Sequence, residues 1–342
     1  MSERVTSIDV AKEAGVSQSA VSRVFSEHGS ASAQTVQKVH HAAAKLGYRP
    51  NILARSLITG KSRIIGVIVA YLENQFYPEA LEKLSSALQA KGYHVLVFLA
   101  SNSQDDIDGV VTEILDYQVD GIVIASASLS SSLSAQCEKA DIPIVMFNRI
   151  DDLSNASYVT SDNYKGGFEI AKYLISCGHQ KISYIAGWEG ASTQRDRENG
   201  FQDGLRQYGY SCHSRAIGNY NHKDAITAAH RLFDTDDKPD ALFICNDHMA
   251  FAVMDVMRHH YGLSIPYDVA VIGYDDTPPA SWPSYALTTM RQPTTQMVDA
   301  CVDILITRIE QDGTGVSNQV IESPFIIRGS TKLPLNHLKN ED

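Results

Sequence analysis

Residues 7–25 read SIDVAKEAGVSQSAVSRVF, and this stretch decides the fold of the amino-terminal part of the chain. Its apolar residues recur at the spacing of one helical face: Ile8, Val10, Ala11 and Ala14. Gly15 then interrupts the helix, and a serine two positions later is a good N-cap for a second short helix. A small residue, a glycine and a β-branched residue at this spacing are typical of a helix-turn-helix.

The second helix of this pair carries candidate DNA-reading side chains. If Ser17 is its N-cap, Val21 faces the core, and the outward residues are Gln18, Ser19 and Arg23. In helix-turn-helix proteins, such residues contact base edges in the major groove. The alternative is a three-helix bundle whose outward polar residues are only solvated.

A third helix and an uneven charge distribution complete this part of the chain. The helix is expected to start at Ser32, to place Val39 in the core and to stop at Gly47. Residues 1–63 carry a net charge of +5, whereas the rest of the chain carries −16. A small basic region on an acidic chain indicates that this region, and not the remainder, binds a polyanion.

From residue 64 onward, short apolar strands alternate with amphipathic helices. The expected strands are IIGVIVA, YHVLVFLA, DGIVIAS and IPIVMFN, followed by a second series that includes KISYIAG, DALFICN and VAVIGYDD. Continuous apolar strands separated by helices are typical of parallel sheets covered on both faces. The two series predict two similar α/β lobes with a cleft between them.

Residues that follow the expected strands are the candidate ligand-binding residues, because ligands bind outside the carboxyl ends of parallel strands. These residues are Phe76, Ser126, Asn148, Asn246 and Asp275, with Arg197 and Tyr220 in later loop or helix-start positions. Amide, carboxylate and guanidinium groups beside an aromatic ring suit a polyhydroxylated ligand. Asp162 and Asp247 are instead expected to be helix N-caps.

The motifs DVAKEAGVSQSAVSRV, SAQT, LGYRPN, ARSL and TGKS, with RGST at residues 328–331, resemble the LacI/GalR (lactose repressor/galactose repressor) family of bacterial transcription regulators. The resemblance covers nearly the whole chain. It implies a multidomain protein with an all-α helix-turn-helix head and a two-lobed, periplasmic-binding-protein-like effector domain. It also implies a homodimer on double-stranded operator DNA, and a small-molecule effector at the candidate residues named above.

The resemblance also gives a role to the stretch PNILARSLITGKS at residues 50–62, because Asn51 to Leu57 within it corresponds to the hinge helix of the family. In that reading Asn51, Ala54 and Leu57 lie in the minor groove, and Leu57 is the wedge that kinks the duplex. A helix this short is not stable alone, so it should form only with DNA and a second hinge present. Ser17 and Ser32 complete the expected DNA-binding set.

Several other classes are disfavoured by what the sequence lacks. It contains no GxSxG, Walker, HExxH or kinase signature, so we expect no enzyme. The five cysteines are scattered, without CxxC spacing, and are expected to be reduced thiols in the cytoplasm. We expect no signal peptide, no membrane span, no metal and no cofactor.

The predicted domains are a head (1–49), a hinge and linker (50–63), an effector and dimerisation domain (64–330) and a tail (331–342). The first lobe would combine about 64–160 with 292–320, and the second about 161–291 with 321–330. The predicted function is repression controlled by a sugar or sugar derivative. A purine co-repressor and, from another class, a sugar-active enzyme with an accessory helical domain remain alternatives. Arg149, Arg195 and Arg197 leave room for an acidic sugar, although Arg149 and Arg195 are also compatible with surface charges.

Overall fold

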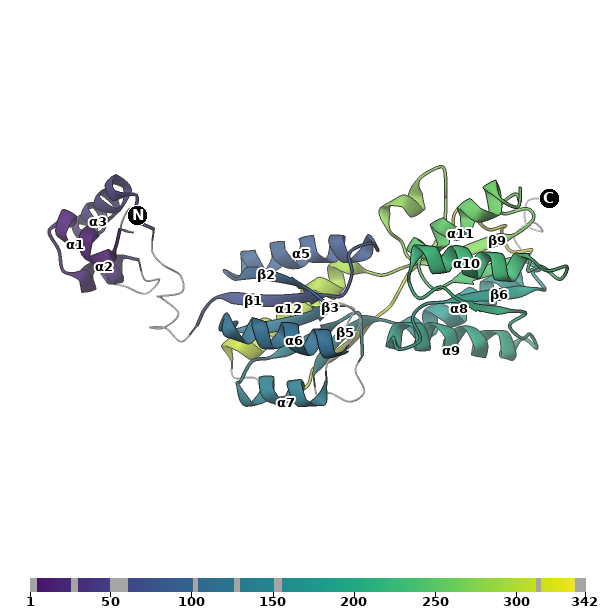
Figure 1. The fold of residues 1–342 in the computed structure, drawn as a ribbon, viewed down its shortest axis with the longest axis horizontal. Coiled ribbons are helices and arrows are strands. Elements are labelled where there is room, and N and C mark those ends of the chain that lie inside the picture. The colour runs from purple at the N-terminus through teal and green to yellow at the C-terminus, as the bar shows by residue number, and fades with distance from the viewer. Residues whose placement is uncertain are drawn as a thin grey trace. The chain divides into compact units, whose positions relative to one another are not determined.

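A computed structural model describes residues 5–25, 30–49, 61–100, 104–125, 130–150, 156–311 and 315–335. The chain divides into two compact units, Met1–Ser62 and Arg63–Asp342. The described part of the first unit is all helical, and the second is α/β (Figure 1). No described helix is long and apolar enough to cross a bilayer.

The first unit is a helix-turn-helix followed by a third helix, and each helix has a local start or stop signal. Its helices are α1 (Ser7–Ala14), α2 (Gln18–Val24) and α3 (Ala33–Leu46). Gly15, at φ +64°, ends α1, and the Ser17 side chain accepts a hydrogen bond from the backbone of α2. Ser32 caps α3, which ends at Gly47 with φ +67°. Glycine adopts this left-handed conformation at no steric cost.

The core of the first unit is small and comes from all three helices. Its buried members are Val10, Ala11, Val21, Val39, Ala42 and Ala43. The prediction that Ile8 belongs to the apolar face is wrong, because its side chain is 61% exposed. Ile8 lies two residues before Val10, which puts it almost on the opposite side of the helix.

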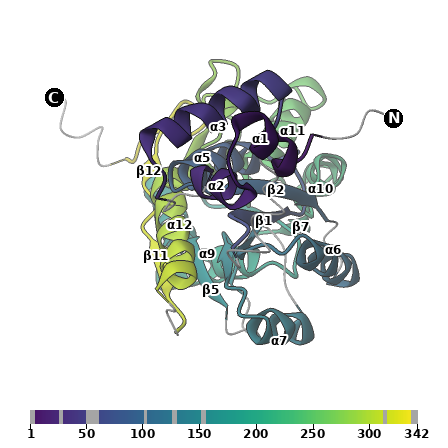
Figure 2. The same cartoon turned by 90° about the vertical axis from the view of Figure 1, so that its left-hand side faces the viewer.

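The first lobe of the second unit is built on a parallel sheet. Six described strands form it in the order β11-β5-β4-β3-β1-β2. Their bounds are β1 (Ile64–Val69), β2 (His94–Leu99), β3 (Gly121–Ala125), β4 (Ile144–Phe147), β5 (Ser157–Ser161) and β11 (Asn318–Ile321). One face is covered by α5 (Phe76–Ala90) and α12 (Thr294–Glu310), the other by α6 (Gln104–Asp116) and α7 (Ser131–Lys139) (Figure 2).

The second lobe repeats this design. Six described strands form its sheet in the order β12-β10-β9-β8-β6-β7, and only the β10–β12 pair is antiparallel. Its elements are α8 (Asn163–Ser176), β6 (Ile182–Ala186), α9 (Ser192–Gln207), β7 (Arg215–Ile217), α10 (His222–Phe233), β8 (Ala241–Ile244), α11 (Asp247–His259), β9 (Ala270–Asp275), a 3-10 turn (Pro278–Ser281), β10 (Thr288–Arg291) and β12 (Phe325–Ile326).

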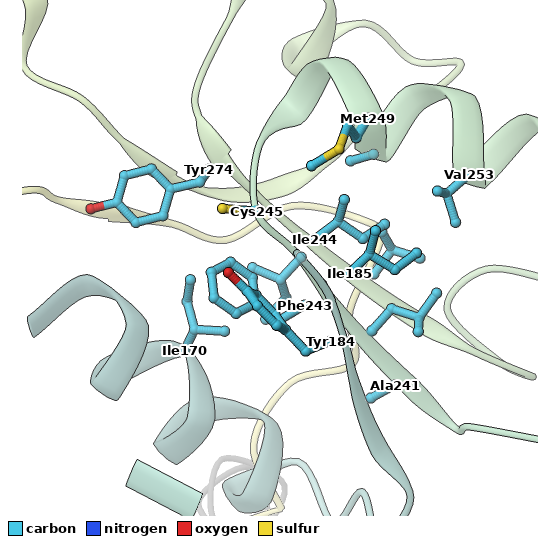
Figure 3. Packing of buried hydrophobic residues seen from close by; sticks show 14 of the residues in the cluster. Ile170, Tyr184, Ile185, Ala241, Phe243, Ile244, Cys245, Met249, Val253 and Tyr274 are labelled. Atoms are coloured by element: carbon cyan, nitrogen blue, oxygen red, sulfur yellow. The ribbon is translucent and has the colours of Figure 1, made fainter. Parts of the chain in front are cut away.

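Alternation along the strands builds the core of this lobe (Figure 3). Tyr184 and Phe243, which are register partners, point toward Ile170 of α8. The next residues along the same strands, Ile185 and Ile244, lie on the opposite face with α11. Because neighbouring strand residues point to opposite faces, both faces of a fully covered sheet must be apolar.

The backbones of α8 and α9 are in contact where the two helices cross. A Cβ atom on Gly167 would lie 2.1 Å from the Arg197 carbonyl oxygen, and one on Gly200 would lie 1.9 Å from the Tyr164 carbonyl oxygen. Only glycine fits at these two positions. The crossing fixes where α9 presents Arg197.

Within the described residues the chain passes between the lobes three times: from β5 to α8, from β10 to α12 and from β11 to β12. Each lobe is therefore assembled from segments that are far apart in the sequence. The three connections follow the carboxyl ends of β5, β10 and β11, where the two lobes meet.

Candidate functional site

The outward face of α2 carries the predicted DNA-reading residues, and all three are exposed. Arg23 Nε donates to the Ser19 carbonyl oxygen at 3.3 Å, and Gln18 Nε2 donates to Ser7 Oγ at 3.1 Å. Neither side chain is part of the core, so both can exchange these contacts for others. Ser7 was missed from the sequence, where no periodic signal marks it, yet it shares this surface with Gln18.

Ser17 and Ser32 occupy the starts of α2 and α3 as capping residues. Their hydroxyl oxygens accept hydrogen bonds from the backbone N–H groups of Ala20 at 3.2 Å and of Thr35 at 3.3 Å. Both serines are exposed. Exposed helix starts attract phosphate groups because their N–H groups and the helix dipole favour negative charge.

Four predicted site residues lie outside the described residues. They are Asn51, Ala54 and Leu57 of the expected hinge, and Ser126 after β3.

The second candidate site is the junction of the two lobes, called the cleft below, where the carboxyl ends of strands from both sheets meet. Asn74, in the loop after β1, donates to Asp275 Oδ2 at the end of β9 over 3.0 Å. The backbone N–H of Ile150, after β4, donates to Ser192 Oγ at the start of α9 over 2.9 Å. These contacts join the first lobe directly to the second.

Arg197 is at the centre of a completed network on the second-lobe side of the cleft. Its Nε donates to Asn163 Oδ1 at 2.8 Å, and its Nη1 donates to the Cys245 carbonyl oxygen at 2.6 Å. Its Nη2 lies 3.7 Å from Asp275 Oδ1, and its guanidinium carbon lies 3.6 Å from the centroid of the Tyr274 ring. The residue is 2% exposed, so the protein satisfies this buried charge almost entirely by itself.

Asp275 is equally engaged. Besides the Asn74 contact, Oδ1 accepts a hydrogen bond from Gln292 Nε2 at 2.7 Å. Burial raises the pKa of Asp275, and the Arg197 charge acts in the opposite direction. Its φ of +124° is a conformation that non-glycine residues rarely adopt, and such strain is concentrated at functional sites.

The first-lobe side of the cleft is less complete. Asn148, at φ +58°, donates from Nδ2 to the Tyr77 hydroxyl at 3.4 Å, but its buried Oδ1 has no hydrogen-bond partner among the described residues. The neighbouring Arg149 is only 2% exposed. The reading of Arg149 as a surface charge is therefore wrong, whereas the side chain of Arg195 is 45% exposed.

The capping role predicted for Asp247 belongs to Asn246. Asn246 is the N-cap of α11, because its Oδ1 accepts from the Met249 N–H at 3.0 Å, and the prediction of Asp247 as the cap is wrong. Asp162 does cap α8, as predicted. The Asn246 Nδ2 is buried and has no partner among the described residues.

Asp247 is a buried support for the loop after β9. Its carboxylate accepts hydrogen bonds from the Thr277 N–H at 2.8 Å and from Thr289 Oγ1 at 2.7 Å. Burial raises the pKa of Asp247 well above its usual value, and the Asp275 charge adds to the effect. The residue holds the turn that carries Asp275 rather than facing the cleft as a free carboxylate.

Two aromatic residues of the predicted set, Tyr220 and Phe76, are buried in the cores of the second and the first lobe. The Tyr220 hydroxyl lies 3.2 Å from Thr193 Oγ1 and 3.3 Å from Cys245 Sγ. Phe76 is 2% exposed and stacks with Phe147 at 6.2 Å between ring centroids, within the first-lobe core.

Sequence reasoning missed Asn74 and Gln292, which both hold Asp275. Asn74 lies in the same loop as Phe76, so a search for polar residues around that position could have found it. Gln292 follows β10, a four-residue strand with no continuous apolar run to mark it. Within the described residues, no cluster of His, Cys, Asp and Glu is arranged to hold a metal ion.

Comparisons with known proteins agree with the division into a helix-turn-helix part and a two-lobed part. The model for bacterial regulatory proteins of the lacI family matches residues 7–51, and a periplasmic binding protein-like domain matches residues 171–331. Catabolite control protein A of Priestia megaterium is 30% identical over 333 residues, which cover 96% of this chain and 99% of that protein. The chain belongs to the LacI family.

Other LacI-family proteins extend the comparison. The HTH-type transcriptional repressor PurR of Vibrio vulnificus (strain CMCP6) is 31% identical over 305 residues, covering 88% of this chain and 91% of the repressor. Among solved structures, a lac repressor dimer bound to operator and the anti-inducer ONPF has a TM-score of 0.87 at 26% identity, with 96% and 99% coverage. A complex of the regulator CelR with cellobiose has a TM-score of 0.72 at 27% identity, with 96% and 100% coverage. This LacI-family chain is a DNA-binding transcriptional regulator.

Proposed function

We propose that this LacI-family regulator is a cytoplasmic repressor that binds a palindromic operator as a homodimer and is controlled by a sugar or sugar derivative held between its lobes. The observation that carries the effector site is a set of buried polar atoms on both sides of the cleft that have no partner among the described residues: Asn148 Oδ1, Asn246 Nδ2 and two nitrogens of Arg149. Buried polar groups in proteins are almost always hydrogen-bonded, so unpartnered donors and acceptors facing one cleft favour a polar ligand.

A polyhydroxylated ligand fits this arrangement well. Each hydroxyl both donates and accepts, so it can serve an amide oxygen, an amide nitrogen and a guanidinium in the same small space. Aromatic rings of Trp188, Tyr220 and Tyr77 border the polar groups and can cover C–H faces of a ring. A regulator solved as a complex with cellobiose shares the fold over 96% of this chain, which supports a saccharide effector.

The head supports sequence-specific DNA recognition. In our proposal α2 enters the major groove, Gln18, Ser19 and Arg23 reach base edges, and the starts of α2 and α3 at Ser17 and Ser32 contact phosphates. Asn51, Ala54 and Leu57 would contact the minor groove at the operator centre.

The first lobe offers a surface for a second copy. β2 is an edge strand of its sheet, and Val97 and Leu99 on it are 45% and 63% exposed. Exposed apolar edge strands are usually covered in the assembled protein. The related lac repressor was solved as a dimer on its operator, and two heads would read a two-fold symmetric site.

Selection from random duplex DNA with the full chain tests the proposal. The enriched sequences should have two-fold symmetry, and their affinity should fall steeply with salt because phosphate contacts release counterions. A panel of sugars and purine bases is then added to the complex, and a sugar should change operator affinity. Enrichment of asymmetric sites would contradict the dimer, and a response to a purine alone would replace the sugar.

A further inference from the structure

Arg149 is a buried cation with two hydrogen-bond donor atoms that no described residue accepts from. The residue is 2% exposed, and its Nε and Nη1 atoms have no hydrogen-bond partner among the described residues. Its guanidinium carbon lies 5.6 Å from the centroid of the Trp188 ring, so an aromatic residue of the second lobe borders the charge. A cation in such a place is stable only when an acceptor joins it.

Arg197 provides an internal comparison for this cation. Both arginines are buried to the same degree and border the same cleft. Arg197 has two hydrogen bonds, an aspartate and an aromatic face supplied by the protein. For Arg149, the described residues supply an aromatic ring and no acceptor for Nε or Nη1. Arg197 is therefore a structural residue of the cleft, whereas Arg149 has hydrogen-bond donors available for a ligand.

No negative charge within the described part of the chain is paired with Arg149. Its neighbour Asn148 is a neutral amide, and the Asp275 carboxylate is shared by Arg197, Asn74 and Gln292. Asp247 accepts its hydrogen bonds from Thr277 and Thr289. Both of these carboxylates thus have other partners, and among the described residues Arg149 has no acidic partner.

We propose that the effector carries a carboxylate that pairs with Arg149, so that it is a sugar acid rather than a neutral sugar. This inference rests on the proposed function. A carboxylate supplies one negative charge and two acceptor oxygens, which match one arginine with unused donors. A phosphate monoester carries more than one negative charge near neutral pH, which exceeds the charge of a single guanidinium group. The unpartnered atoms of Asn148 and Asn246 remain for the hydroxyl groups.

Calorimetric titration of the full chain with matched ligand pairs tests the inference. The pairs are D-glucuronate with D-glucose, D-galacturonate with D-galactose, and D-gluconate with D-sorbitol. In any pair that binds, we expect the acid to bind at least tenfold more tightly than its neutral partner. A neutral sugar that binds as tightly as its acid overturns the inference and leaves the proposed sugar effector intact. If none of the six ligands binds, the sugar-acid inference and the proposed sugar effector both fail.

Substitution of Arg149 separates recognition from structure. Arg149→Gln should weaken binding of the acid at least a hundredfold, because the other partner of the pair is left buried and unpaired. The ligand-free variant should keep or raise its melting temperature, because it loses an unpaired buried charge. Arg195→Gln removes the same charge from an exposed position of α9 and should leave both quantities unchanged. A large loss of melting temperature in ligand-free Arg149→Gln would show a structural role and overturn the inference.

Discussion

The head and the second-lobe wall of the cleft present their functional side chains in opposite ways. On α2, Gln18, Ser19 and Arg23 lie outside a small apolar core and contribute little to it. In the wall, Arg197 and Asp275 are buried and hold one another, and the surrounding helices pack around them. Substitution of a binding residue should therefore leave stability unchanged in the head, whereas in the cleft wall it should change both stability and ligand binding.

The largest expected effect comes from Arg197→Met in the wall. It leaves Asp275 without its cation and removes the arginine donor from Asn163 Oδ1 and from the Cys245 carbonyl oxygen, so we expect a loss of about 3–5 kcal/mol in the unfolding free energy of the second unit. Urea unfolding followed by tryptophan fluorescence measures this directly, because both tryptophans, Trp188 and Trp282, lie in the second lobe.

Arg195→Met, two residues earlier on α9, is the matched control for that experiment. Its side chain is exposed, so the unfolding free energy should change by no more than about 0.5 kcal/mol. Equal effects of the two substitutions would mean that the wall does not depend on its buried network.

The next effect concerns Arg23→Ala in the head. Operator affinity should fall by about 1–3 kcal/mol, with relaxed preference at one base pair of each half-site. Thermal stability should stay the same, since the side chain lies outside the core. Fluorescence anisotropy with single-base operator variants distinguishes the cases: uniform weakening on all sequences would indicate a phosphate contact instead.

Ser17→Ala is expected to affect folding as well as binding in the head, because Ser17 is both the cap of α2 and a predicted DNA contact. Removing the α2 cap should cost about 1 kcal/mol of local stability and increase amide hydrogen exchange throughout that helix. Ser22→Ala, at an exposed position within the same helix, is the control and should leave exchange unchanged or slower. Unchanged exchange in Ser17→Ala would show that the cap does not limit helix stability.

The smallest effect is a pH dependence of the second unit. Burial lowers the pKa of His248, the charge of Glu73 opposes this and His222 adds to it. The folded state thus favours neutral His248, so its contribution is complete above the ordinary histidine pKa of about 6.5 and decreases as the pH falls below it. His248→Gln should reduce the loss of unfolding free energy between about pH 7.5 and about pH 5.5. His94→Gln, at an exposed position, should not.

The head was largely predictable because its signals are local. Gly15, Ser17 and Gly47 act through their own backbone and the next turn of helix, so residue type and spacing suffice. Ile8 was misplaced because one apolar residue at the end of a short pattern does not determine which side of the helix is buried.

The cleft was predictable only to the level of strand ends. Arg149 and Arg195 carry the same two interpretations in the sequence, yet Arg149 is buried and Arg195 is exposed, and the Trp188 ring beside Arg149 comes from the other lobe. The cap of α11 was assigned to Asp247 instead of Asn246 because both residue types cap helices well. A one-residue shift in the helix start decides which of them is the cap. Long-range packing, not local preference, settles such cases.

The three passages between the lobes affect the order in which the protein can be completed during synthesis. The first-lobe core needs Met297, Cys301 and Leu305 of α12, and its sheet needs β11 beside β5, yet these segments leave the ribosome after nearly all of the second lobe. At about 5–20 residues per second, the face of the first lobe that α12 covers stays open for several seconds. A nascent chain that ends before α12 should therefore recruit chaperones through its first lobe, while the second lobe has already closed most of its core.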